Sequence, residues 1–474
     1  MDVVKIATFS ALAIPFVYVV LNAWRNRTVK YGFCSPPGPR GLPLIGSVLD
    51  INVGEPWLTY TEWSKHYGGL ISCTLLGQNI VIISDKNIAD ELLERRSSIY
   101  SSRPCSSISD LLGLADTTAL LPYGSKWRLH RRMHHTTFNK QASMEYGPIQ
   151  IEKAYQLLRN LIATPQEYAN HLETFTGSVI MAITYGYDAD DKEDNFISLS
   201  KRVMEISAEI FTPEYVAMLT AFPSLAYMPS WLPGGRHNRR VGECHAFARR
   251  AMDDPFNYVK DQMISGSARK SLVHDLLVKE DRKIPNHDEI LKAAAATASF
   301  AGLETEGIDQ VVGHDRLPDF RDRENLPYVD AILMETLRWH PVIPLGLPHT
   351  TTSDDVLDGM CIPQGSIILM NIWAITQDET QFPDPTTFKP ERHLVGGRII
   401  EESFSSPLFS IGRRVCPGRY VAVQSMWAAM ACILSTIRIT NAKDEHGNSI
   451  AVVPEFTTGT VMCVFHDLAP FIAI

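Results

Sequence analysis

The sequence predicts one large, mainly helical domain with a small β portion. Apolar residues recur at helical spacing from about Asn87 to Ile308, apart from loops at 100–125 and 212–240. Alternating apolar residues in "LISCTLLG" and "NIVIISD", within residues 70–85, predict a β-hairpin. Residues 340–370 return to short strand-like runs. No repeat or low-complexity tract divides the 474 residues, so a single mainly α fold is expected.

The composition excludes several classes of protein. Hydrophobic residues make up 45% of the chain and charged residues 20%, as in ordinary globular proteins. The net charge of −9 argues against nucleic acid as the main partner, because nucleic acid needs a basic face. The eight Cys are scattered without a CxxC pair, which indicates neither a zinc ribbon nor a dense disulfide framework. A reducing compartment fits this pattern.

Residues 1–24 predict a single-pass transmembrane anchor. The uncharged run from Ile6 to Leu21 and its apolar flanks approach the roughly 20 residues that span a bilayer. Arg25 and Arg27 follow at once and outweigh Lys5, so the positive-inside rule places the rest of the chain in the cytosol. A cleaved signal peptide, which lacks its A-x-A site here, and a buried core helix are the alternatives.

A basic, Pro-rich hinge is expected at residues 25–46. Pro36, Pro37 and Pro39 stiffen it into an extended spacer between the anchor and the globular part. The remaining residues, 47–474, would then form the main domain.

A loop near the C-terminus carries the clearest chemistry. The spacing F-x-x-G-x-R-x-C-x-G is complete in Phe409, Gly412, Arg414, Cys416 and Gly418. Cys416 lies among backbone N–H groups just before a predicted helix, and such a position, with an Arg nearby, favours a thiolate. The two Gly allow tight turns and the close approach of a flat cofactor. A buried structural Cys is the alternative.

This motif and nearly the whole chain after the anchor resemble the cytochrome P450 family of heme-thiolate monooxygenases. "ETLR" supplies Glu335 and Arg338 on one helix face, and "PER" supplies Arg392. In the family these three residues lock the core behind the heme; a surface ion pair is the alternative reading of the first two. His393 stands where the family usually has an aromatic residue.

The resemblance implies heme b as cofactor, with Cys416 as the axial thiolate. Trp127 and Arg131 in "WRLHR" match the family helix that holds a heme propionate. Arg414 and His349, in "PLGLPHT", would also reach propionates, although His349 can equally be an ordinary loop His. Phe409, Gly412 and Gly418 complete the expected cofactor-binding set.

A second motif resembles the family helix that crosses over the heme. "AGLETE" supplies Ala301, Gly302, Glu304 and Thr305, of which Glu304 and Thr305 would relay protons to oxygen. The alternative is a solvated helix end. Gly302 would leave room for oxygen, and Glu306 replaces the second Thr or Ser of the family motif.

The chain departs from the family directly after this motif. "GIDQVVGHDRLPDF" resembles the end of the next family helix, so the sequence predicts a gap between Glu306 and Gly307. The missing part would be roughly 25 residues, nearly 40 Å of helix at 1.5 Å per residue. A skipped exon and a natural shortened variant are both open explanations.

The resemblance also implies the reaction and the partners. Such an enzyme inserts one oxygen atom from O2 into a hydrophobic substrate, with electrons from an NADPH-dependent reductase, at the endoplasmic reticulum membrane. The chain looks most like a fungal, membrane-bound branch that includes enzymes similar to O-methylsterigmatocystin oxidoreductase. This branch suggests aromatic, polyketide or terpenoid substrates, including polycyclic aromatics, in secondary metabolism or xenobiotic oxidation. The alternatives are a shortened heme-binding variant without monooxygenase activity and a heme-dependent rearrangement.

Two surfaces follow from the same resemblance. Basic residues that would meet an acidic reductase face, or form only a solvated surface, are Arg128, Arg132, Arg413 and Arg419. The expected substrate pocket is mostly apolar and draws on residues 111–121, 298–302, 342–345 and 456–460. Residues 222–235 would form either a membrane-dipping access lip or a cap on the core.

Overall fold

The computed structural model describes residues 33–43, 45–104, 107–189, 194–211, 236–279, 285–301, 316–400 and 407–437, with residues 216, 219, 446 and 456. The predicted anchor, the access lip, and Glu304 and Thr305 lie outside these residues. Within the described ranges, the structure contains no helix that is both long and apolar enough to cross a membrane.

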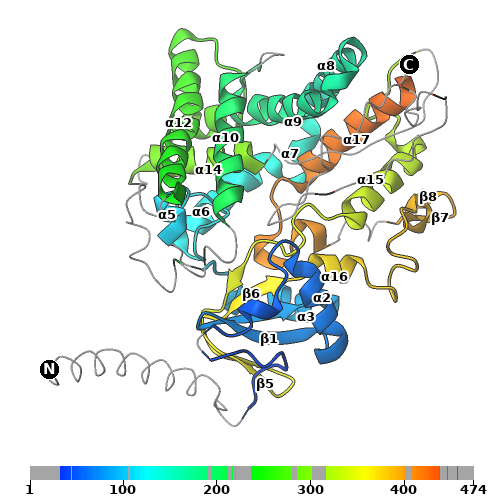
Figure 1. Cartoon of the computed structure of the whole chain (residues 1–474). Helices are drawn as coiled ribbons and strands as arrows, with labels where there is room; N and C mark the ends of the chain where they lie inside the picture. The colour runs from blue at the N-terminus through cyan, green and yellow to red at the C-terminus, as the bar shows by residue number, and fades with distance from the viewer. Residues whose placement is uncertain are drawn as a thin grey trace.

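Most of the described chain is helical, and the helices form the larger part of the molecule (Figure 1). The α-helices are α2 (Pro56–Tyr67), α3 (Lys86–Ala89), α4 (Ser97–Tyr100), α5 (Ser107–Leu111), α6 (Ser125–Phe138), α7 (Lys140–Glu145), α8 (Gly147–Ala163), α9 (Tyr168–Tyr185), α10 (Asn195–Ile210), α12 (Arg236–Ser265), α13 (Leu272–Val278), α14 (His287–Ala301), α15 (Pro327–Trp339), α16 (Ile372–Thr376) and α17 (Arg419–Thr436). The mainly α prediction is confirmed, and α5 is a short helix inside the loop expected at 100–125.

Short turns of other helix types connect these elements. They are η1 (Val48–Asp50), η2 (Asp90–Arg95), η3 (Pro165–Glu167), η5 (Arg323–Asn325), η6 (Pro390–His393), η8 (Pro407–Phe409) and η9 (Gly412–Arg414). The motif around Cys416 therefore begins in η8, passes through η9 and ends at the first turn of α17.

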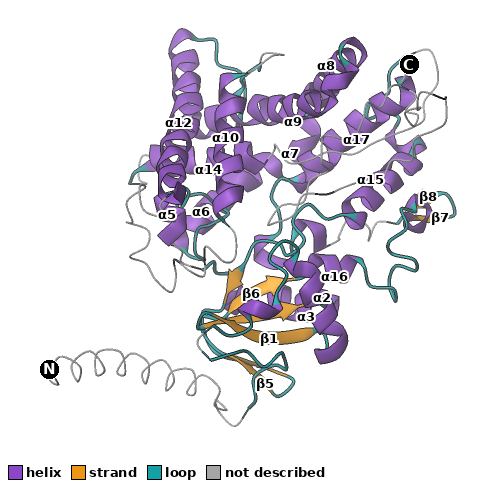
Figure 2. Ribbon diagram, viewed as in Figure 1, coloured by secondary structure: helices purple, strands orange, loops and turns teal. Residues whose placement is uncertain are grey.

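Six of the described strands gather at one end of the molecule, beside α2, α3 and α16 (Figure 2). They are β1 (Leu70–Leu75), β2 (Gln78–Ile83), β3 (His349–Thr350), β4 (Asp355–Leu357), β5 (Met360–Ile362) and β6 (Ile367–Met370). A separate hairpin of β7 (Leu394–Val395) and β8 (Arg398–Ile399) contacts α15. The main sheet has the order β1-β2-β6-β3, and only the β2–β6 pair is parallel. The small β portion expected from residues 70–85 and 340–370 is thus present.

The predicted hairpin turns at two residues with left-handed backbone. Leu76 has φ 48° and Gly77 has φ 83°, which suits a two-residue turn between twisted antiparallel strands. The register pairs Leu70 with Ile83 and Leu75 with Gln78. Apolar residues on both strands are buried, so β2 can lie inside the sheet between β1 and β6.

The described part of the Pro-rich hinge packs along strand β1. The N–H of Ser72 donates to the carbonyl of Pro37 at 2.9 Å, and its hydroxyl donates to that of Pro36 at 2.6 Å. A Cβ on Gly38 would lie 1.9 Å from the carbonyl oxygen of Ser72, so a larger residue would separate the two segments. The hinge therefore enters the domain by covering the edge of the sheet.

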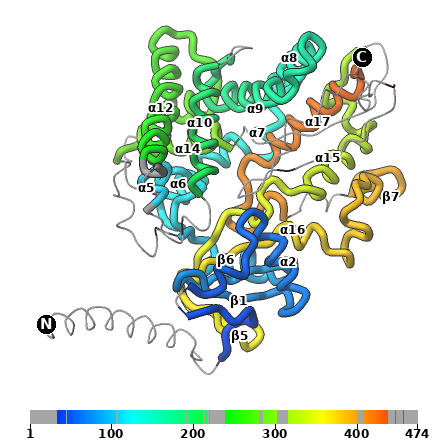
Figure 3. Tube along the Cα trace, viewed as in Figure 1, coloured from blue at the N-terminus to red at the C-terminus, as the bar shows by residue number. Residues whose placement is uncertain are grey.

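The core lies where α17 passes through the helical part. α17 is apolar on most of its surface, with Trp427 fully buried, and it contacts α8 and α15 (Figure 3). A helix that is apolar all round belongs inside a large domain. Cys416 directly precedes this buried helix, so the loop that carries it is held at the centre of the fold.

Candidate functional site

The loop around Cys416 is shaped by its own backbone. The N–H of Cys416 donates to the carbonyl of Phe409 at 2.7 Å, which closes the loop before α17. The backbone N–H groups of Gly418 and Arg419 hydrogen-bond to the Cys416 sulfur. Two donors from a helix N-terminus thus point at one sulfur, an arrangement that stabilises negative charge there.

Burial raises the pKa of the Cys416 thiol above the usual thiol value, and the N–H groups of Gly418 and Arg419 and the charges of Arg131 and Arg419 oppose this shift. The thiolate at Cys416 therefore stays a prediction that depends on a bound metal ion. A bound metal ion would change the balance, because a coordinating thiol loses its proton.

Gly412 is required by the protein backbone. It has φ 70°, in the left-handed region, and a Cβ there would lie 1.9 Å from the carbonyl oxygen of Leu93 in η2. Gly418 has φ −83°, and a Cβ there would meet the Cys416 sulfur at 4.0 Å, an ordinary contact. The close approach that Gly412 permits is thus to η2.

Arg414 is buried among backbone carbonyls. Its Nε donates to Ser101 at 2.8 Å, its Nη1 to Thr118 at 3.2 Å and its Nη2 to Leu121 at 2.6 Å. Its guanidinium lies 4.6 Å from the ring centroid of Trp127, in α6. Three of the five N–H bonds of Arg414 are used in this way, which leaves two for a ligand.

His349, in β3, lies beside the same segment. Its Nδ1 is 2.8 Å from the carbonyl of Tyr100, and the residue is buried. Burial and the charges of Arg103 and Arg414 lower the pKa of His349, partly opposed by the bond to Tyr100, so the ring is neutral. A neutral ring with Nδ1–H bonded leaves Nε2 as an acceptor, whereas a protonated ring would donate from both nitrogens.

Arg103 belongs to this group, although it lies in none of the motifs found in the sequence. Its Nε donates to Ala119 at 3.0 Å, and its Nη1 donates to Leu347 at 2.8 Å and to Pro348 at 2.7 Å. It is buried, and burial and the charge of Arg414 lower its pKa well below the usual Arg value. It lies three residues after Tyr100, in the segment whose carbonyls contact His349 and Arg414.

Arg131 completes the cluster from α6, four residues after Trp127. Burial lowers its pKa, the Cys416 side chain raises it, and the charge of Arg419 lowers it. Its charge in turn lowers the pKa of Arg414, which burial and Arg131 together bring to about 10. Arg131 is therefore near both Cys416 and Arg414.

Among the described residues, no carboxylate pairs with Arg103, Arg131 or Arg414. Arg103 and Arg414 are buried and Arg131 is half-buried. Cations shielded from water without a counterion are costly, so such a cluster indicates a site for a bound anion. A porphyrin with two propionates next to a single thiol meets this requirement in both charge and chemistry. The residues present therefore fit a heme.

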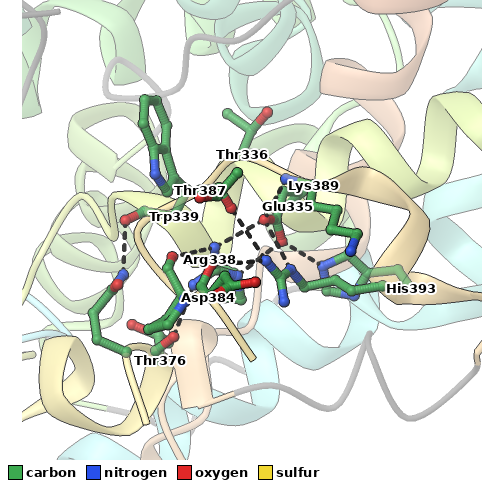
Figure 4. A network of polar contacts seen from close by, with 12 residues as sticks. Glu335, Thr336, Arg338, Trp339, Thr376, Asp384, Thr387, Lys389 and His393 are labelled. Carbon is green, nitrogen blue, oxygen red and sulfur yellow. Dashed lines mark hydrogen bonds and ion pairs between the residues drawn. The ribbon is translucent and has the colours of Figure 1, made fainter. Parts of the chain in front are cut away.

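A second network lies behind the loop and is centred on Glu335 (Figure 4). Arg338 donates to both Glu335 oxygens at 2.8 Å, and Arg392 Nε donates to Oε1 at 3.0 Å. His393 Nε2 is 3.0 Å from Oε2, and the N–H of Lys389 donates to Oε1 at 2.9 Å. The three residues expected to interact do lie together.

The geometry explains why this carboxylate stays charged although it is fully buried. Burial would raise the pKa of Glu335, but bonds from Arg338, His393 and the Lys389 N–H, with the Arg338 charge, lower it to about 2. His393, where the family usually has an aromatic residue, is thus a further partner of the same carboxylate.

The chain belongs to the cytochrome P450 family. The family model described as Cytochrome P450 matches residues 36–306 and 305–450. The match consists of two segments that meet at residues 305 and 306, the junction at which the sequence predicts a gap.

The particular relatives are fungal monooxygenases. The chain is 36% identical to cytochrome P450 monooxygenase COX2 of Coprinopsis cinerea, over 94% of this chain and 89% of that protein. It is 35% identical to cytochrome P450 monooxygenase claR of Ampulloclitocybe clavipes, over 90% of this chain and 84% of that protein. It is 34% identical to cytochrome P450 monooxygenase ppsD of Aspergillus oryzae, over 93% of this chain and 88% of that protein. The chain is therefore an oxidoreductase of the monooxygenase type by family.

Proposed function

We propose that this chain is a heme-thiolate monooxygenase that oxidises a hydrophobic small molecule with O2 and electrons from an NADPH-dependent reductase. The observation that carries the proposal is the cluster of two buried cations, Arg103 and Arg414, with the half-buried Arg131, which lies near Cys416. None of the three has a described carboxylate partner. This donor set is suited to the propionates of a heme whose iron Cys416 binds.

The bound heme would supply the iron at which O2 is activated, and thiolate ligation favours cleavage of the O–O bond. The protein residues have separate tasks. The N–H groups of Gly418 and Arg419 would stabilise the Cys416 thiolate, and Glu304 and Thr305 would carry protons through a carboxylate and a hydroxyl. Trp127 would hold the propionate side, together with the three Arg. His349 would join them only as a protonated ring, because its neutral ring donates to Tyr100 and leaves Nε2 as an acceptor.

A reductase would meet the surface next to Arg413. Arg413 and Arg128 are exposed and flank the ring of Tyr123, with guanidinium carbons 5.1 and 5.6 Å from its centroid. Arg132 is exposed and Arg419 is half-buried. This basic surface supports an acidic partner, and the predicted anchor at residues 1–24 would hold both proteins at the endoplasmic reticulum membrane.

The substrate would be hydrophobic, because the helices around the expected pocket present apolar side chains. One apolar cluster joins α5, α10, α12 and α14 through Ile108, Val203, Ala248 and Phe300. Relatives named only as monooxygenases support the reaction type, and the choice among aromatic, polyketide and terpenoid substrates rests on the sequence resemblance.

A shortened, catalytically impaired heme protein is the second candidate, favoured by the divided family match at residues 305–306. The alignment with the Coprinopsis relative extends over 477 positions but includes only 94% of this 474-residue chain, so the relative contains residues that this chain lacks.

Turnover in ¹⁸O2 tests the proposal and separates the two candidates. The holo-chain, an NADPH-dependent reductase and a panel of hydrophobic compounds should give products with one ¹⁸O atom, and Cys416→Ala should give none. Heme binding without labelled product from any compound, while a full-length relative is active in parallel, would favour the second candidate. Equal labelling by the Cys416→Ala variant would contradict the proposed role of Cys416.

A further inference from the structure

Thr118 lies where three elements around the site meet. Its backbone N–H donates to Thr297 Oγ1 in α14 at 2.9 Å. Its hydroxyl is 3.0 Å from His130 Nδ1 in α6, and its carbonyl accepts from Arg414 Nη1 at 3.2 Å. Each polar group of this one buried residue therefore contacts a different element.

Thr297 supplies the hydroxyl oxygen through which α14 contacts Thr118. Its hydroxyl hydrogen is used within the helix, because Oγ1 donates to the carbonyl of Ala293 at 2.8 Å. The oxygen lone pairs are then available to accept the Thr118 N–H. Thr297 lies four residues before Ala301, the last described residue of α14, and eight before Thr305 in the sequence.

A parallel link fixes α14 to α6. His134 Nε2 is 2.9 Å from the carbonyl of Ala294, and both His134 and His130 are fully buried. Burial and neighbouring charges lower the pKa of His130 to about 4, so its ring is neutral at pH 7 and bonds to the Thr118 hydroxyl as a neutral group. The two links differ in what they reach. Thr118, which bonds to α14, also accepts a hydrogen bond from Arg414, whereas the His134 bond joins only α6 and α14.

We propose that Thr118 and Thr297 are positioning residues that set the distance between α14 and the Arg414–Cys416 loop. This inference rests on the proposed function, since α14 and that loop would lie on opposite faces of the heme. The hydrogen bond from the Thr118 N–H to Thr297 joins the segment that supplies carbonyls to Arg103 and Arg414 to the helix that leads into Glu304 and Thr305. Loss of this bond would let α14 move relative to the heme while Cys416 stays in place.

The test compares Thr297→Val with Thr297→Ser. Val has nearly the same shape but no acceptor, whereas Ser keeps the oxygen. Thr174→Val is a matched control, because Thr174 also donates to its own helix, to Asn170 at 2.8 Å, and has no described bond to another element. Hydrogen exchange of the Thr118 amide reports on the bond itself, and carbon monoxide rebinding after flash photolysis reports on the space above the heme.

We expect Thr297→Val to exchange the Thr118 amide about fivefold faster, the factor that corresponds to the loss of a typical hydrogen bond of about 1 kcal/mol. Carbon monoxide rebinding should change by a similar factor, while the thiolate-type spectrum is kept. Thr297→Ser and Thr174→Val should match the unchanged chain in both measurements.

Three results would overturn the inference or its basis. Unchanged exchange at Thr118 in Thr297→Val would show that the bond holds nothing in place. If the Thr118 amide exchanges faster but carbon monoxide rebinds at an unchanged rate, Thr118 and Thr297 do not position α14 relative to the heme. A missing thiolate-type spectrum in the unchanged chain would overturn the proposed function. The exchange rate of the Thr118 amide would still report whether the bond to Thr297 forms. If Thr297→Val does not fold, Thr297→Ala against Thr297→Ser decides the matter, because Ala also lacks the oxygen that accepts the Thr118 N–H and Ser keeps it.

Discussion

Arg103 holds together two segments that are far apart in the sequence. It donates to Ala119 on one side and to Leu347 and Pro348 on the other, and no described carboxylate balances its charge. A buried guanidinium in this position both fixes the backbone and needs an anion. Its contribution should therefore appear in folding and in heme retention together.

We expect Arg103→Ala to lower the free energy of unfolding by about 3 kcal/mol, because three carbonyls lose their donor. Heme retention should fall as well, and Arg103→Lys should be intermediate because it keeps the charge without the forked donors. Arg95→Ala is the control, since Arg95 is 77% exposed and pairs only with Glu91. Heme titration and urea unfolding measure both effects, and equal behaviour of the Arg103 and Arg95 variants would contradict this role.

Single residues also show what the sequence could and could not predict. The Cys416 loop and the Glu335, Arg338 and Arg392 set could be found because fixed spacing places them on elements of known type. Arg103 could not, since its partners lie in separate loops whose approach depends on the whole fold. The rise in the pKa of the Cys416 thiol could not be predicted, because it comes from burial, which only the folded chain shows.

At the scale of elements, α15 and η6 are joined by one carboxylate. Glu335 is fully buried, and its partners come from its own helix and from η6. The contact places the residues after Pro390 against α15 (Figure 4). The sequence predicted the two Arg contacts, whereas the His393 contact could be seen only after both elements were placed.

Substitutions at this contact should lower the free energy of unfolding by very different amounts. Glu335→Gln leaves Arg338 and Arg392 without a charge partner, and we expect a loss of about 3–5 kcal/mol in the free energy of unfolding. His393→Phe removes one bond and should cost about 1–2 kcal/mol. Thr336→Val, in the same helix, is the control, because that hydroxyl bonds only to Ile332 at 2.9 Å. Urea unfolding measures all three, and a Glu335→Gln loss no larger than the control would refute the account of this network.

Helix α6 gives a pH dependence of stability. Burial lowers the pKa of His130 and of His134 to about 4, from the usual 6.5. The unfolded chain therefore binds more protons between these values, and the free energy of unfolding should fall as the pH falls from 6.5 to 4. Each ring would contribute on the order of 3 kcal/mol over this window. Glu335 adds a further loss only below pH 4.5, since its pKa is about 2.

Urea unfolding at pH 7.0 and pH 4.5 measures the histidine effect apart from Glu335. The difference should shrink in His134→Gln, because that variant removes one of the two buried rings. An unchanged difference would show that these rings do not control the acid response.

At the scale of the whole molecule, the junction between Glu306 and Gly307 decides whether the chain can act. The family match divides there, and α14 is described only to Ala301. The overall fold could be predicted because hydrophobic periods and motifs recur in the order of the family. The effect of the gap on stability could not be predicted, because it depends on how neighbouring helices cover the apolar surface that the missing segment would bury.

We expect that insertion of the corresponding segment of the Coprinopsis relative after Glu306 will raise thermal stability and heme occupancy. Each 100 Å² of apolar surface covered contributes about 2.5 kcal/mol. A scrambled segment of equal length is the control. If the native and scrambled insertions have the same midpoint of thermal unfolding, the gap has no structural cost.

The reduced carbon monoxide difference spectrum of this chain in microsomes tests whether Cys416 binds the heme iron. We expect a thiolate-type Soret band, which Cys416→Ala loses and Cys432→Ala, at a buried Cys in α17, retains. A heme band without the thiolate-type shift in the unchanged chain, or the same thiolate-type band in Cys416→Ala, would contradict the assignment of Cys416 as the heme ligand.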